Sequence, residues 1–264
     1  MSSLTLETPR TTLPFIRLRR ASPLLWWTSL GFLALFAVCA LLPLIDPRLF
    51  NGTSVWVKPA KFFLSLSLHM LTLSFGLTLL PEKIVTRWWA SLVTITMASM
   101  AILEMVYIIF RAARGEASHF NTSSELAGLL YSLMGLGAAL MMAVTLVLGV
   151  QIIRHGSATL IARATGWGFI TAAILTLIVG FTLGGMGSHW IGGDQTDATG
   201  LPLLGWSTTG GDLRSAHFAG LHIMQVLPFA ALTRSRRIVW LTGLFMLMAT
   251  AIAYILALNG IPLI

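Results

Sequence analysis

The stretch "LAGLLYSLMGLGAALMMAVTLVLGVQII", residues 126–153, contains no charged side chain. An α-helix rises about 1.5 Å per residue, so a helix of this length exceeds the ~30 Å hydrocarbon core of a bilayer. The whole chain has the same character, because 56% of its residues are hydrophobic, 10% are charged and its mean hydropathy is +0.84. A water-soluble globule needs more polar surface than this. The sequence therefore predicts an integral membrane protein surrounded by lipid.

Seven segments are long and apolar enough to cross a bilayer as helices. They lie near residues 24–45, 57–80, 88–110, 126–153, 166–186, 215–232 and 238–258. Thr122 and Glu125 have the spacing of a capping box, which favours a helix start there. No long linker divides the chain. The predicted fold class is therefore all-α, with a single transmembrane domain over residues 1–264 whose first 23 residues form a cytoplasmic segment.

The distribution of lysine and arginine predicts the orientation, because these residues collect in cytoplasmic loops. The chain has 17 of them and a formal net charge of +8. A cytoplasmic N-terminus places eleven on the cytoplasmic side: Arg10, Arg17, Arg19, Arg20, Lys83, Arg87, Arg154, Arg163, Arg234, Arg236 and Arg237. The prediction is a cytoplasmic N-terminus and an extracytoplasmic C-terminus. Orientation in the bilayer also explains the basic charge, so nucleic acid is not an expected partner.

Polar side chains form stripes at the extracytoplasmic ends of three predicted helices. At 100° per residue, the members of each stripe fall on roughly one face. The stripes consist of Lys58, Lys61 and His69; Glu104, Tyr107 and Arg111; and Arg214, His217, His222 and Gln225. Ionisable groups in lipid cost about 2.5–3.5 kcal/mol each, so the stripes are expected to face one another. Glu104 is expected to pair with Arg111, Lys61 or Arg214.

These stripes predict an outward-facing polar pocket between the second, third and sixth helices. The pocket would bind, sense or transport a small ligand, and the lysines and arginines favour an anionic one. Two alternatives stay open. His69 and His222 lie at similar depth and could be the axial ligands of a b-type haem in a redox protein, and a metal-binding redox protein is the related option. The stripes could instead only specify packing in a structural bundle or assembly factor.

No familiar catalytic motif accompanies these residues. The sequence lacks HExxH, GxxxxGK[ST] and GxSxG, and the last predicted helix has no lysine for a retinal Schiff base. His217 and His222 are 140° apart on a helix, which disfavours joint metal binding. No metal site and no catalytic residue is predicted, and whether the protein is an enzyme stays open.

Three segments carry a resemblance: "NGTSVWVKPAKF", "EMVYIIFRAARGEASHFN" and "GLPLLGWSTTGGDLRSAHFAGLHIMQVLP". They resemble an uncharacterised group of bacterial polytopic membrane proteins, and the resemblance covers most of the chain. It implies a multi-pass protein of the bacterial cytoplasmic membrane. It does not indicate which activity the protein has. The paired histidines are loosely similar to haem A synthase and other membrane cytochromes b, although the histidine-arginine pattern of the former is missing. "GFTLG" fits the GxxxG packing motif, so a homo-oligomer is one option.

The predicted orientation can be tested with topology reporters. A reporter fused after Ile264 should be active only outside the cytoplasm, whereas one inserted at Ser235 should be active only inside it. Alkaline phosphatase and green fluorescent protein, which work on opposite sides of the membrane, give the two readouts. The reverse pattern would invert the orientation.

Overall fold

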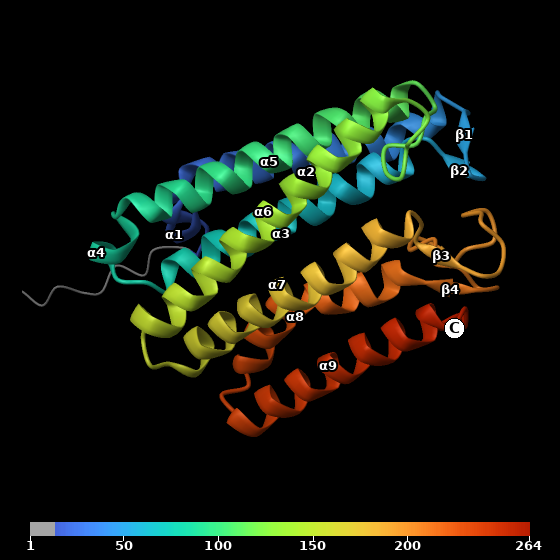
Figure 1. Ribbon diagram of the computed structural model, residues 1–264. Coiled ribbons are helices and arrows are strands. Elements are labelled where there is room, and N and C mark those ends of the chain that lie inside the picture. Colours follow the sequence, from blue (N-terminus) through green and yellow to red (C-terminus); the bar gives the residue numbers. More distant parts are fainter. Residues whose placement is uncertain (1–13) are drawn as a thin grey trace, which may run out of the picture.

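The computed structural model describes residues 14–264, and long helices dominate it (Figure 1). The predicted N-terminal segment lies outside the described residues as far as residue 13. Helices and strands follow in the order α1 (Pro14–Ala21), α2 (Pro23–Leu41), η1 (Leu42–Leu44), β1 (Leu49–Phe50), β2 (Thr53–Ser54), α3 (Val57–Thr78), α4 (Glu82–Val85), α5 (Trp88–Ala113), α6 (Glu125–His155), α7 (Leu160–Met186), β3 (Trp190–Ile191), β4 (Gly211–Asp212), α8 (Leu213–Ala231) and α9 (Arg236–Leu258).

Six helices within residues 14–264 are long and apolar enough to cross a membrane, and they indicate a multi-pass membrane protein. They are α2 together with η1, α3, α5, α6, α7 and α9. The prediction of an all-helical membrane bundle is confirmed at this level. The remaining long helix, α8, is not among them, because polar residues such as Arg214 and Gln225 lower its hydropathy. The seventh span and the orientation of the termini stay predictions.

Side-chain caps fix where several helices begin. Ser124 accepts a hydrogen bond from the backbone N–H of Ala127, so α6 begins at Glu125 and not at the predicted Thr122. Thr159 caps α7 in the same way, and this helix begins six residues before the predicted boundary. An N-cap oxygen satisfies a backbone N–H that has no partner inside the helix. The starts of α6 and α7 therefore depend on local hydrogen bonds.

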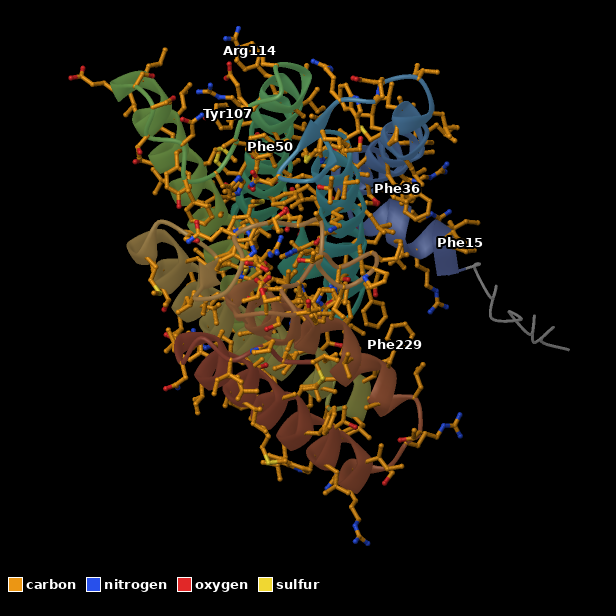
Figure 2. The ribbon with its side chains drawn as sticks, turned by 90° about the vertical axis from the view of Figure 1, so that its right-hand side faces the viewer. Phe15, Phe36, Phe50, Tyr107, Arg114 and Phe229 are labelled. Carbon is orange, nitrogen blue, oxygen red and sulfur yellow. The ribbon has the colours of Figure 1, made fainter. Side chains whose placement is uncertain are left out.

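The helices form two neighbouring groups. In the first, α2, α3, α5 and α6 pack together, and in the second α8 lies between α7 and α9 (Figure 1). Ser67 Oγ of α3 donates to the backbone oxygen of Ser29 of α2 at 3.0 Å. The main contact between the groups is that of α6 with α7. Phe15 and Phe229 lie on the outside of the bundle (Figure 2), with 66% and 70% of their surface exposed.

Two short antiparallel ribbons lie at one end of the bundle (Figure 1). The β1–β2 hairpin turns through Asn51 and Gly52, whose φ angles are 49° and 82°. An Asn-Gly pair favours such a turn, because both residues tolerate positive φ. The second ribbon pairs Trp190 with Asp212 and so closes the long loop before α8 onto itself. We call this end, with the α5–α6 loop and the C-terminus, the hairpin end.

Because α6 packs closely on α7, we expect one methyl group added at Gly149 to destabilise the protein. A Cβ added to Gly149 would lie 2.9 Å from the backbone oxygen of Gly166 and 2.9 Å from Cβ of Phe169. Overpacking of this kind costs about 1–3 kcal/mol, so Gly149→Ala should lower the melting temperature of the detergent-purified protein. The control is Gly135→Ala on the same helix, because nothing lies within 4 Å of an added Cβ there. Equal melting of the two variants would contradict this packing.

Candidate functional site

Arg214, at the start of α8, forms ion pairs with two aspartates of the same chain. Its guanidinium donates to Asp212 Oδ2 at 2.7 Å, to Asp197 Oδ1 at 2.8 Å and to the backbone oxygen of Gly205 at 2.6 Å. It also lies 5.6 Å from the ring centre of Trp190. Asp197 and Gly205 belong to the loop 188–212. Arg214 therefore attaches this loop to α8.

Lys61 attaches the same loop to α3. Its Nζ donates to the backbone oxygen of Leu204 at 3.0 Å. The loop also contacts the β1–β2 turn, where the backbone N–H of Asp197 donates to the backbone oxygen of Asn51 at 2.9 Å. The loop thus bridges α3, the β1–β2 hairpin and α8 at the hairpin end. Two cations predicted to recruit a ligand therefore hold a loop in this structure.

Lys58, one turn before Lys61, faces the α5–α6 loop. Its Nζ lies 3.1 Å from Nδ1 of His119. Burial lowers the pKa of His119 well below its usual range, and the charge of Lys58 lowers it further. A neutral ring that accepts a hydrogen bond from an ammonium group at Nδ1 carries its own proton on Nε2. Lys58 also interacts electrostatically with Glu104 of α5.

Glu104 is buried, with 8% of its surface exposed, and its Oε2 has no hydrogen-bond partner. The predicted ion pair with Arg111, Lys61 or Arg214 is wrong. Within residues 14–264 those three cations bind Glu116, the backbone oxygen of Leu204 and two aspartates, respectively. Each of these three cations has an acceptor in a loop that lies closer to it than the carboxylate of Glu104. The cation whose charge acts on Glu104 is Lys58.

His189, near the start of the loop 188–212, contacts Phe120 of the α5–α6 loop. Its ring contacts that of Trp190 at 3.9 Å between centres in a tilted arrangement, and the ring centre of Phe120 lies 6.0 Å away. Burial lowers the pKa of His189 to about 3, and the charge of Arg214 contributes in the same direction. The ring is therefore neutral, and its buried Nε2 has no hydrogen-bond partner. Helical periodicity did not indicate His189 as a site residue, because it lies in an irregular loop.

Two deeper residues connect neighbouring helices. His69 Nε2 of α3 lies 2.9 Å from Thr145 Oγ1 of α6, and Thr145 in turn donates to a backbone oxygen of its own helix. Gln225 Nε2 of α8 donates to Thr72 Oγ1 of α3 at 3.3 Å, whereas Gln225 Oε1 is buried without a partner. Gln225 thus supplies a hydrogen bond between the two helix groups.

The two histidines of α8 differ in their partners. His222 stacks on Phe218 at 3.9 Å, and its Nδ1 lies 2.7 Å from the backbone oxygen of that residue. His217 Nδ1 is buried and has no partner. His222 acts electrostatically on both His217 and His69. In this arrangement His69 contacts α6 through Nε2, so it does not present that atom to a group shared with His222.

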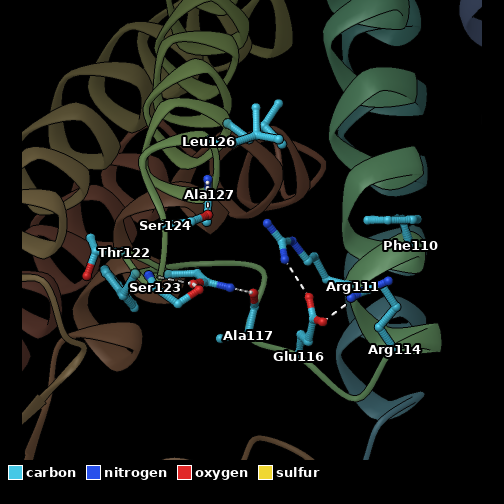
Figure 3. Close-up of a pocket in the computed structure, with 13 residues that line it drawn as sticks. Phe110, Arg111, Arg114, Glu116, Ala117, Thr122, Ser123, Ser124, Leu126 and Ala127 are labelled. Atoms are coloured by element: carbon cyan, nitrogen blue, oxygen red, sulfur yellow. Dashed lines mark hydrogen bonds and ion pairs between the residues drawn. The ribbon is translucent and has the colours of Figure 1, made fainter.

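Arg111 and Tyr107 form a separate pair on α5. Arg111 Nε donates to the hydroxyl oxygen of Tyr107 at 3.1 Å, which agrees with the predicted position of both on one face. Arg111 then pairs with Glu116 of the α5–α6 loop, and Arg114 binds the other oxygen of that carboxylate at 2.8 Å (Figure 3). Hydrogen bonds from Arg111 and then Arg114 lower the pKa of Glu116.

The predicted site residues are therefore distributed over three places: the loop attachments of Lys61 and Arg214, the α5 pair of Tyr107 and Arg111, and the interior. We call the interior set the polar interior, and it consists of Lys58, His69, Glu104, His119, His189, His217, His222 and Gln225. Asp197, Asp212, Glu116, His119 and His189 were not predicted. Within residues 14–264 no group of three or more His, Cys, Asp or Glu side chains could hold a metal ion.

Comparison with protein-family models, with curated proteins and with solved structures finds no match to this chain.

The Asp212 carboxylate should be the most sensitive position at the hairpin end. It is 4% exposed, caps α8 through the N–H of Arg214 and accepts from the N–H of Ser207 at 2.9 Å. Asp212→Ala removes the cap and leaves buried donors unpartnered, which should cost about 2–4 kcal/mol of unfolding free energy. Thermal melting measures this loss. Asp194→Ala, an exposed change in the same loop, should melt like the parent, and similar losses in both variants would contradict the assignment.

Proposed function

We propose that this is a membrane protein that binds a small polar ligand in the polar interior, between α3, α5 and α8. The observation that supports the proposal is a set of buried polar atoms without partners in four of its residues: Glu104 Oε2, His189 Nε2, His217 Nδ1 and Gln225 Oε1. Buried polar atoms are nearly always hydrogen-bonded, and an unpartnered one costs about 1–3 kcal/mol. A ligand or ordered water that bonds to these atoms removes that cost.

Electrostatic interactions connect these residues to one another. Lys58 interacts with Glu104, and His119 interacts with Lys58, His189 and His217. These groups come from α3, α5, α8 and two loops, so their proximity depends on the tertiary structure. A ligand among them would meet both donors and acceptors.

The charge of the ligand depends chiefly on Lys58. Lys61, Arg111 and Arg214 already have acceptors within the described residues, which weakens the part of the hypothesis that assigned all four cations to an anion. Lys58 has the ring of His119 as its hydrogen-bond partner and Glu104 as its charged neighbour. We therefore propose a small polar ligand that directs an acidic or strongly accepting group toward Lys58.

The proposal includes α8 as a seventh span. Both α7 and α9 are candidate spans, and both run toward the hairpin end (Figure 1). The chain between them has to return through the same thickness, and α8 lies along both helices. Seven spans place the C-terminus opposite a cytoplasmic N-terminus, so the hairpin end faces outward. The resemblance to bacterial proteins makes the bacterial cytoplasmic membrane the proposed location.

The haem alternative has less support than ligand binding. To ligate a haem through Nε2, His69 would have to give up its contact with Thr145, and His222 Nδ1 already contacts the backbone oxygen of Phe218. The structural alternative is the direct competitor, since polar residues also fix helix packing in membranes. The structural alternative predicts that neither water nor a ligand enters the polar interior. Whether any ligand is chemically converted is outside the proposal.

Cysteine accessibility separates a ligand site from dry packing. The chain has a single cysteine, the buried Cys39, so Cys39→Ala gives a background without thiols. In this background His217→Cys should react with a membrane-impermeant methanethiosulfonate added from the hairpin side, because a ligand route admits water. Asp197→Asn should accelerate the reaction by weakening the loop attachment. Mass spectrometry of the intact protein measures both.

The matched control is Ser67→Cys, a nearly isosteric change at a fully buried position between α2 and α3. It should stay unmodified under the same conditions. If His217→Cys is as inert as Ser67→Cys, even with Asp197→Asn, the polar interior is dry and only the packing role survives. If His217→Cys is modified, small polar compounds that slow its modification are the candidate ligands.

A further inference from the structure

A second site lies outside the polar interior, between the end of α5 and the start of α6 (Figure 3). This cavity has a volume of about 810 Å³. Its lining combines three ionised side chains, several small polar ones and an apolar part: Phe110, Arg111, Arg114, Glu116, Ala117, Phe120, Asn121, Thr122, Ser123, Ser124, Leu126, Ala127 and Leu130. A cavity of this size holds a small molecule or the head of a larger one.

The ionised groups leave a single positive charge. Arg111, Arg114 and Glu116 are the ionisable residues of the lining, and two arginines against one glutamate give a net charge of +1. The arginines also have unused donors. Each guanidinium carries five N–H groups, but only Arg111 Nε and Nη1 and Arg114 Nε donate to side chains here. The cavity thus has donors and charge for one further monovalent anion.

The apolar part of the lining includes side chains that are exposed on the surface of the bundle. Phe110 and Leu126 expose 54% and 64% of their surface, and they lie at the ends of two helices that are candidate spans. The cavity is therefore located where the hydrocarbon core gives way to lipid headgroups. A molecule that fits it has an anionic group for the arginines and a hydrocarbon part beside Phe110, Leu126 and Leu130.

We propose that this cavity binds the phosphodiester headgroup of an anionic phospholipid, with its acyl chains along the exposed residues of α5 and α6. A phosphodiester carries one negative charge, which matches the residual charge of the arginines. Arginine is also the side chain best suited to hydrogen-bond two phosphate oxygens at once. A free phosphate ion shares this chemistry but has no hydrocarbon to contact Phe110 and Leu126.

The test is native mass spectrometry of the detergent-purified protein titrated with phosphatidylglycerol and, separately, with phosphatidylcholine of the same acyl chains. The wild type should bind phosphatidylglycerol more tightly. Arg114→Gln should weaken that binding by about tenfold, the effect of one charge-assisted hydrogen bond, because this side chain is 58% exposed and has most of its donors free. Phosphatidylcholine binding should change less.

Glu116→Gln should have the opposite effect, since it raises the net charge of the cavity and frees donors on both arginines. This second variant keeps the proposal testable if Arg114→Gln folds poorly. Arg154→Gln, an exposed change in the last turn of α6, is the matched control and should leave phosphatidylglycerol binding unchanged.

Two outcomes would overturn the proposal. If Arg114→Gln and Glu116→Gln bind phosphatidylglycerol like the wild type, the cavity does not hold the headgroup. If inorganic phosphate or glycerol phosphate at millimolar concentration displaces the lipid, the site binds soluble phosphates and the acyl chains contribute nothing. Failure of either kind leaves the polar interior unaffected, because its residues do not line this cavity.

Discussion

The ion pair between Asp212 and Arg214 organises the hairpin end of the molecule. Asp212 is almost fully buried, and a buried carboxylate is tolerated only when donors surround it. Here the donors are the N–H that begins α8, the N–H of Ser207 and the guanidinium of Arg214. Because Arg214 also binds Asp197, the same pair determines where the loop 188–212 lies over α3 and α8. The direction of α8 and the position of the loop are therefore set together.

The polar groups of the bundle differ in how completely they are satisfied. At the loop attachments Arg214 has several partners and Lys61 has one, as expected for groups that maintain a structure. In the polar interior, Glu104 and His217 have buried atoms with none. A network that served only packing would lower its free energy by pairing these atoms or replacing them with apolar ones. This contrast is the basis of the proposed ligand site.

The sequence predicted the features that depend on composition and helical periodicity. Uninterrupted apolar length was enough to predict six candidate spans, and the spacing of four residues correctly placed Tyr107 beside Arg111. The sequence did not predict which side chains far apart in the chain form ion pairs. The predicted pairs of Glu104 failed because Arg111 and Arg214 found carboxylates in loops. Glu116 and Asp197 reach those arginines only once the loops have folded, and helical periodicity carries no information on loop paths.

The polar character of α8 has a consequence for how the protein is made. As the proposed seventh span, α8 gains little from leaving the translocon alone, because the charged Arg214 at its start and the polar His222 and Gln225 nearer its middle oppose partitioning into lipid. Its neighbours α7 and α9 are apolar and pack along it on two sides. We therefore expect α8 to leave the translocon together with α9, after α7 is already in the membrane. Biogenesis of this protein would then depend on the final two helices emerging from the ribosome as a pair.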